Sequence, residues 1–262
     1  VITITTDFGH KGPFAGVMKG VILARFPQAR VVDLAHDIPA QWPPEAGFWV
    51  SRSYAWFPIG TVHMAIVDPG VGTERDILLA EVDGHIFIAP DNGLLGPLLD
   101  PIESPSVFKL DAGRTRSLHL KTPSATFHGR DIFAPVAAEL AAGRTSVDDI
   151  GVPVTEWTPG WIDEPESATG NVSGVIVTID AFGNLISNID ASLIDNFVEP
   201  VANIAGHQIP MLQTYGRAKP GDLLALVNSF SVVEIAKAEG SAAESLGSAR
   251  GAPLAIREGY ST

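Results

Sequence analysis

The first 150 residues of the chain alternate between short apolar runs rich in Val, Ile and Thr and longer segments with helical spacing. β-Branched runs bounded by turn residues are typical of strands. The pattern predicts strands at Val1–Thr6, Val31–Leu34, Thr61–Val67, Ile77–Val82 and His85–Ala89, and helices from Pro13 to about Arg25, from Pro44 to Trp56 and from Ile132 to Ala142. Strands that alternate with helices indicate an α/β domain with a largely parallel central sheet.

The first predicted helix offers one candidate for a buried stripe. Phe14, Val17, Val21 and Leu23 or Ala24 recur at helical spacing, so we expect them to face the sheet. Pro13 suits the first turn of this helix because its missing N–H has no partner there in any case.

The pattern changes between about Gly151 and Gly170, where prolines and acids accumulate as in a linker. The segments that follow are short, apolar and separated by turn residues, which predicts a smaller all-β domain, a barrel or a sandwich. Its expected strands are Val172–Asp180, Asn184–Ile189, Val201–Ile204, Gln208–Leu212, Leu223–Val227, Ser231–Ala236 and Pro253–Arg257. We therefore predict an α/β domain at 1–152, a linker at 153–170 and a β-barrel-like domain at 171–262.

Composition narrows the classes of function. Of the 262 residues 45% are hydrophobic and 18% charged, as in globular proteins, and the absence of cysteine excludes disulfides and a cysteine nucleophile. The formal charge of −13 disfavours nucleic acid and anionic lipid as partners. No apolar run is long enough to span a membrane, and the amino end lacks the basic region of a signal peptide, so we expect a cytoplasmic protein.

Charged residues stand where predicted strands meet turns. Asp7 follows the first strand, Asp68 and Arg75 flank the Gly-rich turn after the third, and His128 precedes a helix. In parallel sheets, ligand sites lie beyond the carboxyl ends of the strands. Each residue also has a plainer interpretation: Asp7 as a helix cap, Asp68 with Arg75 as a structural ion pair, and His128 as a spectator. Their occurrence together in an α/β frame favours a site that polarises a small nucleophile such as water.

A second group of polar residues lies in the predicted β domain. Asp180-Ala181-Phe182-Gly183-Asn184 joins two strands and fits a hairpin turn with Gly183 at positive φ. It equally fits a binding platform, in which Phe182 stacks on a flat heterocycle, Asn184 supplies a donor and an acceptor, and Asp180 binds an amine. Trp42, in a Pro-flanked loop of the first domain, is a candidate ligand wall, although burial is the commoner fate of Trp.

Several motifs together resemble one family, from Val1 to about Ala243. The chain is similar to the S-adenosyl-L-methionine (SAM) hydroxide adenosyltransferases, also called SAM hydrolases (adenosine-forming), which are relatives of fluorinase and chlorinase. The motifs are Thr6-Asp7-Phe8-Gly9, Met18-Lys19-Gly20-Val21-Ile22, Val67-Asp68-Pro69-Gly70-Val71-Gly72, Ala89-Pro90-Asp91-Asn92-Gly93, Thr126-Phe127-His128-Gly129-Arg130-Asp131 and Val233-Glu234-Ile235-Ala236. Gly12-Pro13-Phe14 departs from the pattern, since members often carry an acid and a Tyr there.

The resemblance implies hydrolysis of SAM to adenosine and L-methionine by attack of water at the ribose C5′, without a cofactor. It also implies a homotrimer with sites between subunits. The implied catalytic residues are Asp68, Arg75 and His128. The implied contacts of the sugar are Asp7, which binds the ribose, and Trp42 beside it; those of methionine are Asp180 for the amine and Ser229 for the carboxylate. The implied contacts on the adenine side are Phe182, Asn184, Glu234 and the Gly240–Ala242 backbone, including Ala242.

Three alternatives remain open from the sequence. A SAM-dependent halogenase would use chloride or fluoride as the nucleophile, but a carboxylate at Asp68 would repel a halide. A metal-dependent hydrolase would use Asp7, His10, Asp68 and His128, although no His pair has helical ligand spacing. A non-catalytic SAM or adenosine-binding protein would bind the ligand without turnover.

Overall fold

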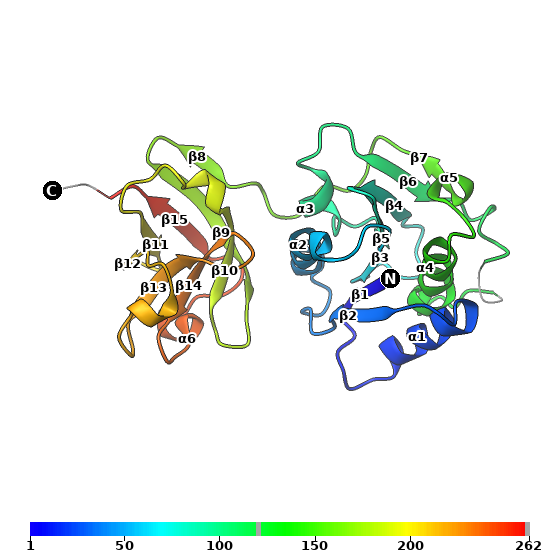
Figure 1. The fold of residues 1–262 in the computed structure, drawn as a ribbon, viewed down its shortest axis with the longest axis horizontal. Helices are drawn as coiled ribbons and strands as arrows, with labels where there is room; N and C mark the ends of the chain where they lie inside the picture. Colours follow the sequence, from blue (N-terminus) through cyan, green and yellow to red (C-terminus); the bar gives the residue numbers. More distant parts are fainter. Residues whose placement is uncertain (119–121, 260–262) are drawn as a thin grey trace. The chain divides into compact units, whose positions relative to one another are not determined.

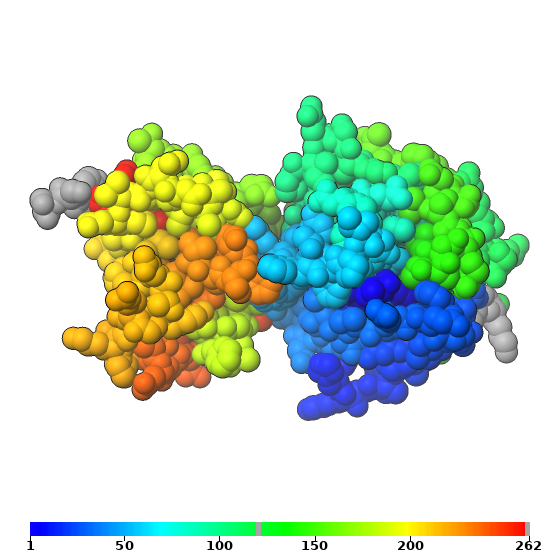
Figure 2. Space-filling view, viewed as in Figure 1, coloured from blue at the N-terminus to red at the C-terminus, as the bar shows by residue number. Residues whose placement is uncertain are grey.

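The computed structural model describes residues 1–118 and 122–259, and it divides the chain into two compact units, Val1–Trp161 and Ile162–Thr262 (Figure 1). The division falls within the segment 153–170 that the sequence suggests as a linker. The predicted second domain extends to residue 262, and its last three residues lie outside those described. The colours of Figure 2 run from blue to green over the first unit and from yellow-green to red over the second.

The first unit is built on a mixed, mostly parallel sheet. Strands β2, β1, β3 and β5 are parallel neighbours, and β4, β6 and β7 continue the sheet in antiparallel orientation. This confirms the predicted α/β class. In sheet order the strands are β2 (Val31–Ala35), β1 (Ile2–Thr6), β3 (Val62–Ile66), β5 (His85–Pro90), β4 (Ile77–Val82), β6 (Ser106–Leu110) and β7 (Gly151–Pro153).

Helices cover both faces of this sheet (Figure 1). On one face the apolar side chains of β1 and β3 pack with those of α1 and α4, and on the other face α2 packs beside α3. Each face of the sheet therefore has its own apolar core. The helices are α1 (Phe14–Arg25), α2 (Pro43–Ser53) with the 3₁₀ turn Tyr54–Trp56, α3 (Gly96–Leu99), the π turn η2 (Gly129–Phe133), α4 (Ala134–Ala141) and α5 (Val147–Ile150).

The predicted stripe of α1 is wrong. Met18 and Ile22 are fully buried, whereas Phe14, Val17 and Leu23 are 48%, 39% and 44% exposed. Ala24 is exposed as well, and Val21 is only partly buried. Two apolar stripes with the same spacing run along this helix, and packing against α4 selects the one that contains Met18 and Ile22.

The second unit is a nearly closed, barrel-like antiparallel sheet, which confirms the predicted all-β class. A bridge between Met211 and Ala225 brings the segment after β12 to β13, at opposite ends of the strand order. In that order the strands are β12 (His207–Pro210), β11 (Val201–Ile204), β15 (Pro253–Arg257), β9 (Asn171–Ile179), β10 (Leu185–Asp190), β14 (Val232–Lys237) and β13 (Leu223–Val227), with β8 (Glu166–Ala168) beside β9 and helix α6 (Ala242–Leu246) following β14.

Candidate active site

The loop between β3 and β4 holds a buried ion pair. Arg75 Nε donates to both carboxylate oxygens of Asp68, at 2.9 and 3.0 Å, and Nη2 also donates to Oδ2. The two side chains are only 11% and 5% exposed. A bidentate guanidinium–carboxylate contact fixes the plane of the guanidinium as well as its position. Asp68 therefore presents Arg75 in one orientation.

His128, immediately before the π turn η2, lies against this pair. Its Nδ1 is 3.3 Å from Arg75 Nη2. Because a guanidinium can only donate, Nδ1 accepts and the ring proton of the neutral imidazole resides on Nε2. Burial and the positive charge of Arg75 lower the pKa of His128, and the nearby carboxylates of Asp68 and Asp131 oppose the shift only in part. His128 is therefore neutral at neutral pH and able to take up a proton.

Backbone contact holds the two loops together. Gly72 adopts φ +80°, and a Cβ built there would lie 2.1 Å from the carbonyl oxygen of Ala125. The neighbouring Ser124 amide donates to the Asp131 carboxylate at 2.8 Å. Only glycine combines this left-handed backbone with so close an approach. The residue types of both loops thus bring His128 to Arg75.

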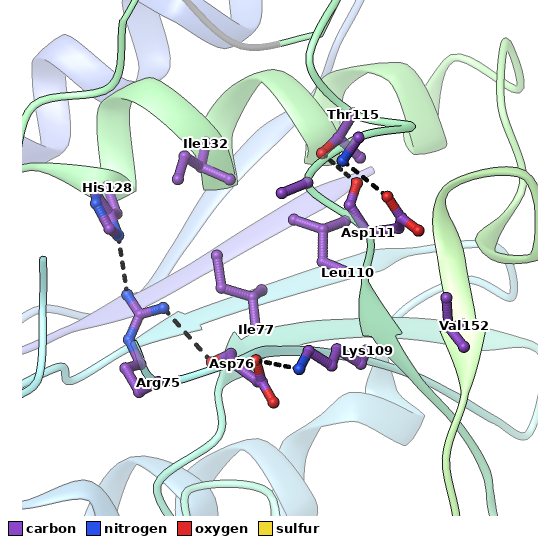
Figure 3. Close-up of a pocket in the computed structure, with 12 residues that line it drawn as sticks. Arg75, Asp76, Ile77, Lys109, Leu110, Asp111, Thr115, His128, Ile132 and Val152 are labelled. Carbon is purple, nitrogen blue, oxygen red and sulfur yellow. Dashed lines mark hydrogen bonds and ion pairs between the residues drawn. The ribbon is translucent and has the colours of Figure 1, made fainter. Parts of the chain in front are cut away.

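Arg75 and His128 line one end of a cavity of about 430 Å³ (Figure 3). Figure 3 shows Arg75 reaching toward His128, with Ile77 and Ile132 alongside. Farther along the cavity, Lys109 forms an ion pair with Asp76 at 2.7 Å. The cavity has room for water beside the guanidinium and the imidazole, and its apolar walls limit competing polar contacts.

Asp7 lies at the same edge of the sheet. Since β1 pairs in parallel with β3, Asp7 and Asp68 both follow the carboxyl ends of neighbouring strands. Asp7 Oδ2 accepts a hydrogen bond from the Gln41 amide at 2.9 Å, and Gln41 adopts φ 61°. The interpretation of Asp7 as a helix cap is wrong, because α1 begins after Pro13 without a side-chain cap.

Trp42 follows Gln41 and leads into α2. Its ring stands edge-on to Trp161, with centroids 5.7 Å apart. In residues 1–118 and 122–259, the buried indole N–H of Trp42 has no hydrogen-bond partner. The ring is therefore positioned by packing and keeps a free donor.

In the second unit, Asp180 organises the turn between β9 and β10. Its Oδ1 accepts from the amides of Phe182 and Asn184, both at 2.9 Å, and its Oδ2 accepts from Asn184 Nδ2 at 2.9 Å. Gly183 has φ +81°, which confirms the predicted hairpin turn. Phe182 is 79% exposed, whereas Asn184 is 7% exposed. The turn thus combines an exposed aromatic ring with an amide side chain that is held in place.

Glu234 lies on β14 and is 3% exposed. Its carboxylate accepts from Tyr215 Oη at 2.5 Å and from Asn228 Nδ2 at 3.1 Å. Burial raises the pKa of Glu234 despite these hydrogen bonds. Burial and the Glu234 contact likewise raise the pKa of Tyr215. Ser229 is exposed in the adjoining turn, and Ala242 is buried at the start of α6.

The structure brings Asp68, Arg75 and His128 together at the sheet edge that also carries Asp7. No sequence motif points to Tyr215, which begins the 3₁₀ turn Tyr215–Arg217. Its distance from β14 along the chain hides the contact with Glu234. Among the described residues, no three His, Cys, Asp or Glu side chains converge to hold a metal ion, and His10 lies 3.5 Å from Asp37. No described helix is long and apolar enough to span a bilayer.

Comparison with known proteins gives consistent matches. Residues 2–151 match the family model of the SAM hydroxide adenosyltransferase N-terminal domain, and residues 174–255 match that of the C-terminal domain. The chain is 37% identical over 257 residues to an (R)-S-adenosyl-L-methionine hydrolase of Thermus thermophilus, covering 96% of this chain and 97% of that protein. It is 28% identical over 217 residues to a fluorinase of an Actinoplanes species, covering 72% of this chain and 71% of that protein. A crystal structure of an uncharacterized conserved protein from Thermotoga maritima superposes with a TM-score of 0.90 at 30% identity, covering 98% of this chain and 100% of that one.

Proposed function

The chain belongs to the SAM hydroxide adenosyltransferase family, and from that premise we propose that it hydrolyses S-adenosyl-L-methionine to adenosine and L-methionine. It is an enzyme of that family, and its (R)-S-adenosyl-L-methionine hydrolase relatives support this reaction. The observation that carries the proposal is the contact of the Asp68–Arg75 ion pair with the neutral imidazole of His128.

The reaction is a displacement at the ribose C5′. A water oxygen forms a bond to C5′ on the side opposite the sulfur, the C5′–S bond breaks, and its electron pair returns to sulfur. The sulfonium leaves as a neutral thioether, so the leaving group needs no general acid. The enzyme must instead position and desolvate the water, and correct alignment of two reactants contributes about 7–11 kcal/mol.

The triad supplies a place for that water. The water oxygen accepts a hydrogen bond from Arg75 and lies between its guanidinium and His128, and the two side chains separate from their present contact of 3.3 Å to admit it. One water proton then points to Nδ1, which accepts it as the oxygen bonds to C5′. Asp68 holds Arg75 throughout. The resulting imidazolium loses its proton to solvent, which completes the balance of atoms and charge.

The remaining residues are proposed to bind the substrate. The Asp7 oxygen not used by Gln41 accepts from the ribose hydroxyls, and Trp42 flanks the sugar. In the second unit, Asp180 meets the methionine amine and Ser229 its carboxylate. Phe182, Asn184, Glu234 and Ala242 form the adenine side. We also propose that no cofactor takes part, that the protein acts in the cytoplasm, and that it forms a homotrimer whose sites use residues of neighbouring subunits.

Product analysis tests the reaction. Purified protein is incubated with SAM in ¹⁸O-labelled water that contains chloride. The nucleosides are then separated by chromatography, and their masses are measured by mass spectrometry. We expect adenosine that carries ¹⁸O at C5′ and an equal amount of methionine. Formation of 5′-chloro-5′-deoxyadenosine would instead identify a halogenase, and ligand binding without turnover would identify a binding protein.

A variant pair tests the triad. Arg75→Lys removes the fork that contacts Asp68 and His128 together, and we expect the rate constant to fall by about 10²–10³. Arg144→Lys is the matched control, because Arg144 also pairs with a carboxylate, that of Glu139 at 2.6 Å, but does not line the cavity beside Arg75. Its rate should stay within a factor of about two. Equal rates for the two variants would refute the role of Arg75.

A further inference from the structure

One buried imidazole lies directly behind the Asp7 turn and takes no part in the proposed chemistry. His36, just after β2, is 2% exposed. β2 is the parallel neighbour of β1 (Figure 1), so His36 follows the carboxyl end of the strand beside the one that delivers Asp7. Burial of a polar ring at this depth is costly unless the ring has polar partners.

His36 contacts the turn that carries Asp7 through its side chain and its main chain. His36 Nδ1 is 2.7 Å from Thr6 Oγ1, and the same hydroxyl oxygen accepts from the Phe8 amide at 3.2 Å. The His36 carbonyl accepts from the Gly9 amide at 2.8 Å. The residues on both sides of Asp7 are thus held by His36, directly or through Thr6.

The segment after His36 returns to hold Asp7 itself. The Gln41 amide donates to Asp7 Oδ2, and Gln41 has the left-handed φ of 61°. The segments 6–9 and 36–41 are therefore tied at Thr6, Asp7 and Gly9. The Gln41 amide thus fixes Oδ2 of Asp7. The conformation of the turn then determines the direction of Oδ1.

The far side of the ring lies beside a charged pair, at ion-pair distance but without hydrogen-bond geometry at Nε2. His36 Nε2 is 2.9 Å from Asp33 Oδ1, and Asp33 Oδ2 accepts from Lys19 Nζ at 2.5 Å. Burial opposes ionisation of Asp33, but the interactions with Lys19 and His36 outweigh it and lower the pKa of Asp33. The hydrogen bond between Nδ1 and Thr6 therefore determines the orientation of the ring, and the charge of Asp33 lies beside Nε2.

We propose that His36 is a positioning residue for substrate binding: through its contact with Thr6 it sets the direction of the Asp7 carboxylate toward the two ribose hydroxyls. The inference rests on the proposed ribose role of Asp7. His36 acts through Thr6 and Asp7 and touches no substrate atom.

Two conservative substitutions separate the contacts of the ring. In His36→Asn the side-chain amide keeps a polar atom at the place of Nδ1 and the bridge to Thr6, but no longer reaches Asp33. In His36→Gln the amide reaches the place of Nε2 and Asp33, but the contact with Thr6 is lost. We expect Asn to preserve the geometry of the Asp7 turn better than Gln.

The measurement is ligand discrimination. Binding of adenosine, 2′-deoxyadenosine and 3′-deoxyadenosine is determined by calorimetry for each protein. A hydrogen bond to a carboxylate makes the intact nucleoside bind about 10–100 times more tightly than each deoxy analogue. We expect Asp7→Ala to reduce this ratio to about one and His36→Gln to about three or less, while His36→Asn keeps most of it.

His63 supplies the matched control. It is buried on β3, and its Nδ1 is 2.8 Å from Thr3 Oγ1, the same pair of groups at the opposite end of β1. His63→Gln should lower the melting temperature yet leave the discrimination ratio unchanged. If His36→Gln also lowers the melting temperature and leaves the ratio unchanged, His36 is merely structural and the inference fails. If Asp7→Ala itself keeps the ratio, the proposed ribose contact fails first.

Discussion

At position 128, burial and the neighbouring guanidinium act in the same direction. Both disfavour the imidazolium and lower the pKa of His128 from its ordinary value of 6.5. Asp68 and Asp131 pull the other way, but they do not restore that value. A base that must be neutral before each turnover benefits from a lowered pKa, because a larger fraction of the enzyme is then competent at neutral pH.

The predicted consequence is an acid limb of kcat/KM that lies below pH 6.5. The neutral form persists until the pH falls through the lowered pKa, so activity should be flat near neutrality and decline only at lower pH. The pH profile of kcat/KM, measured with SAM, reports this pKa for the free enzyme. His128→Asn should lower the rate by about 10² or more and abolish the limb. An acid limb above pH 6.5, or one that survives in His128→Asn, would assign the titration to another group.

The sequence was sufficient to group Asp7, Asp68, Arg75 and His128, since each stands where a predicted strand or helix meets a turn. It was not sufficient to find His36 or Tyr215. The role of His36 depends on which strand lies beside β1, and that of Tyr215 on a contact with β14 that no local pattern encodes. The left-handed backbone of Gln41 is equally hidden, because that conformation is uncommon for a residue other than glycine.

Among the connecting elements, the turn from Asp68 to Arg75 is held by backbone fit. The amides of Val71 and Thr73 donate to the carbonyls of Asp68 and Gly70, which curls the loop so that Gly72 meets Ala125. Because the two loops carry side chains of the proposed triad, we expect the fit at Gly72 to determine how close Arg75 comes to His128.

Gly72→Ala should therefore lose more activity than stability alone explains. A left-handed alanine costs about 1–2 kcal/mol, and the new Cβ must also displace the Ala125 carbonyl, which lies 2.1 Å from its position. Misplacement of a reacting group by about 1 Å can cost about 10² in rate. We expect kcat to fall by about this factor of 10². It is measured at a temperature at which chemical denaturation shows that the variant is folded.

Gly60→Ala provides the comparison for that variant. Gly60 has nearly the same φ, +81°, but no atom lies within 4 Å of a Cβ built there. It should show the conformational cost of about 1–2 kcal/mol with kcat unchanged. Similar kcat values for the two variants would mean that the contact with Ala125 does not set the catalytic geometry.

The elements themselves were predicted unevenly. Strands β1, β3 and β5 are apolar runs with clear turn residues, and the pattern located them. Strand β6 was not predicted. Its residues form a strand by pairing with β4 and β7, and that pairing is not visible in the sequence. The buried face of α1 was assigned wrongly for a related reason: two stripes fit the helical period, and only the position of α4 decides between them.

For the molecule as a whole, the relevant quantity is charge. The chain carries 30 acidic and 17 basic residues, a formal charge of −13. SAM carries a sulfonium, an ammonium and a carboxylate, hence a net charge of +1. An acidic protein attracts such a substrate over distances set by ionic screening. After turnover the sulfonium is gone, and neither adenosine nor methionine carries a net charge, so the long-range attraction acts on the substrate and not on the products.

This asymmetry predicts that KM for SAM rises with ionic strength while kcat stays constant. Between about 0.01 and 0.15 M salt the screening length falls from about 30 to about 8 Å, and we expect KM to increase by a factor of about 2–5. Potassium acetate serves as the salt because it adds no halide. The buried Asp68–Arg75 pair is screened much less, which keeps kcat unchanged. The inhibition constant of uncharged adenosine, measured in the same series, should not move. If it rises in parallel with KM, salt acts on the site itself and the charge of the molecule has no part in capturing the substrate.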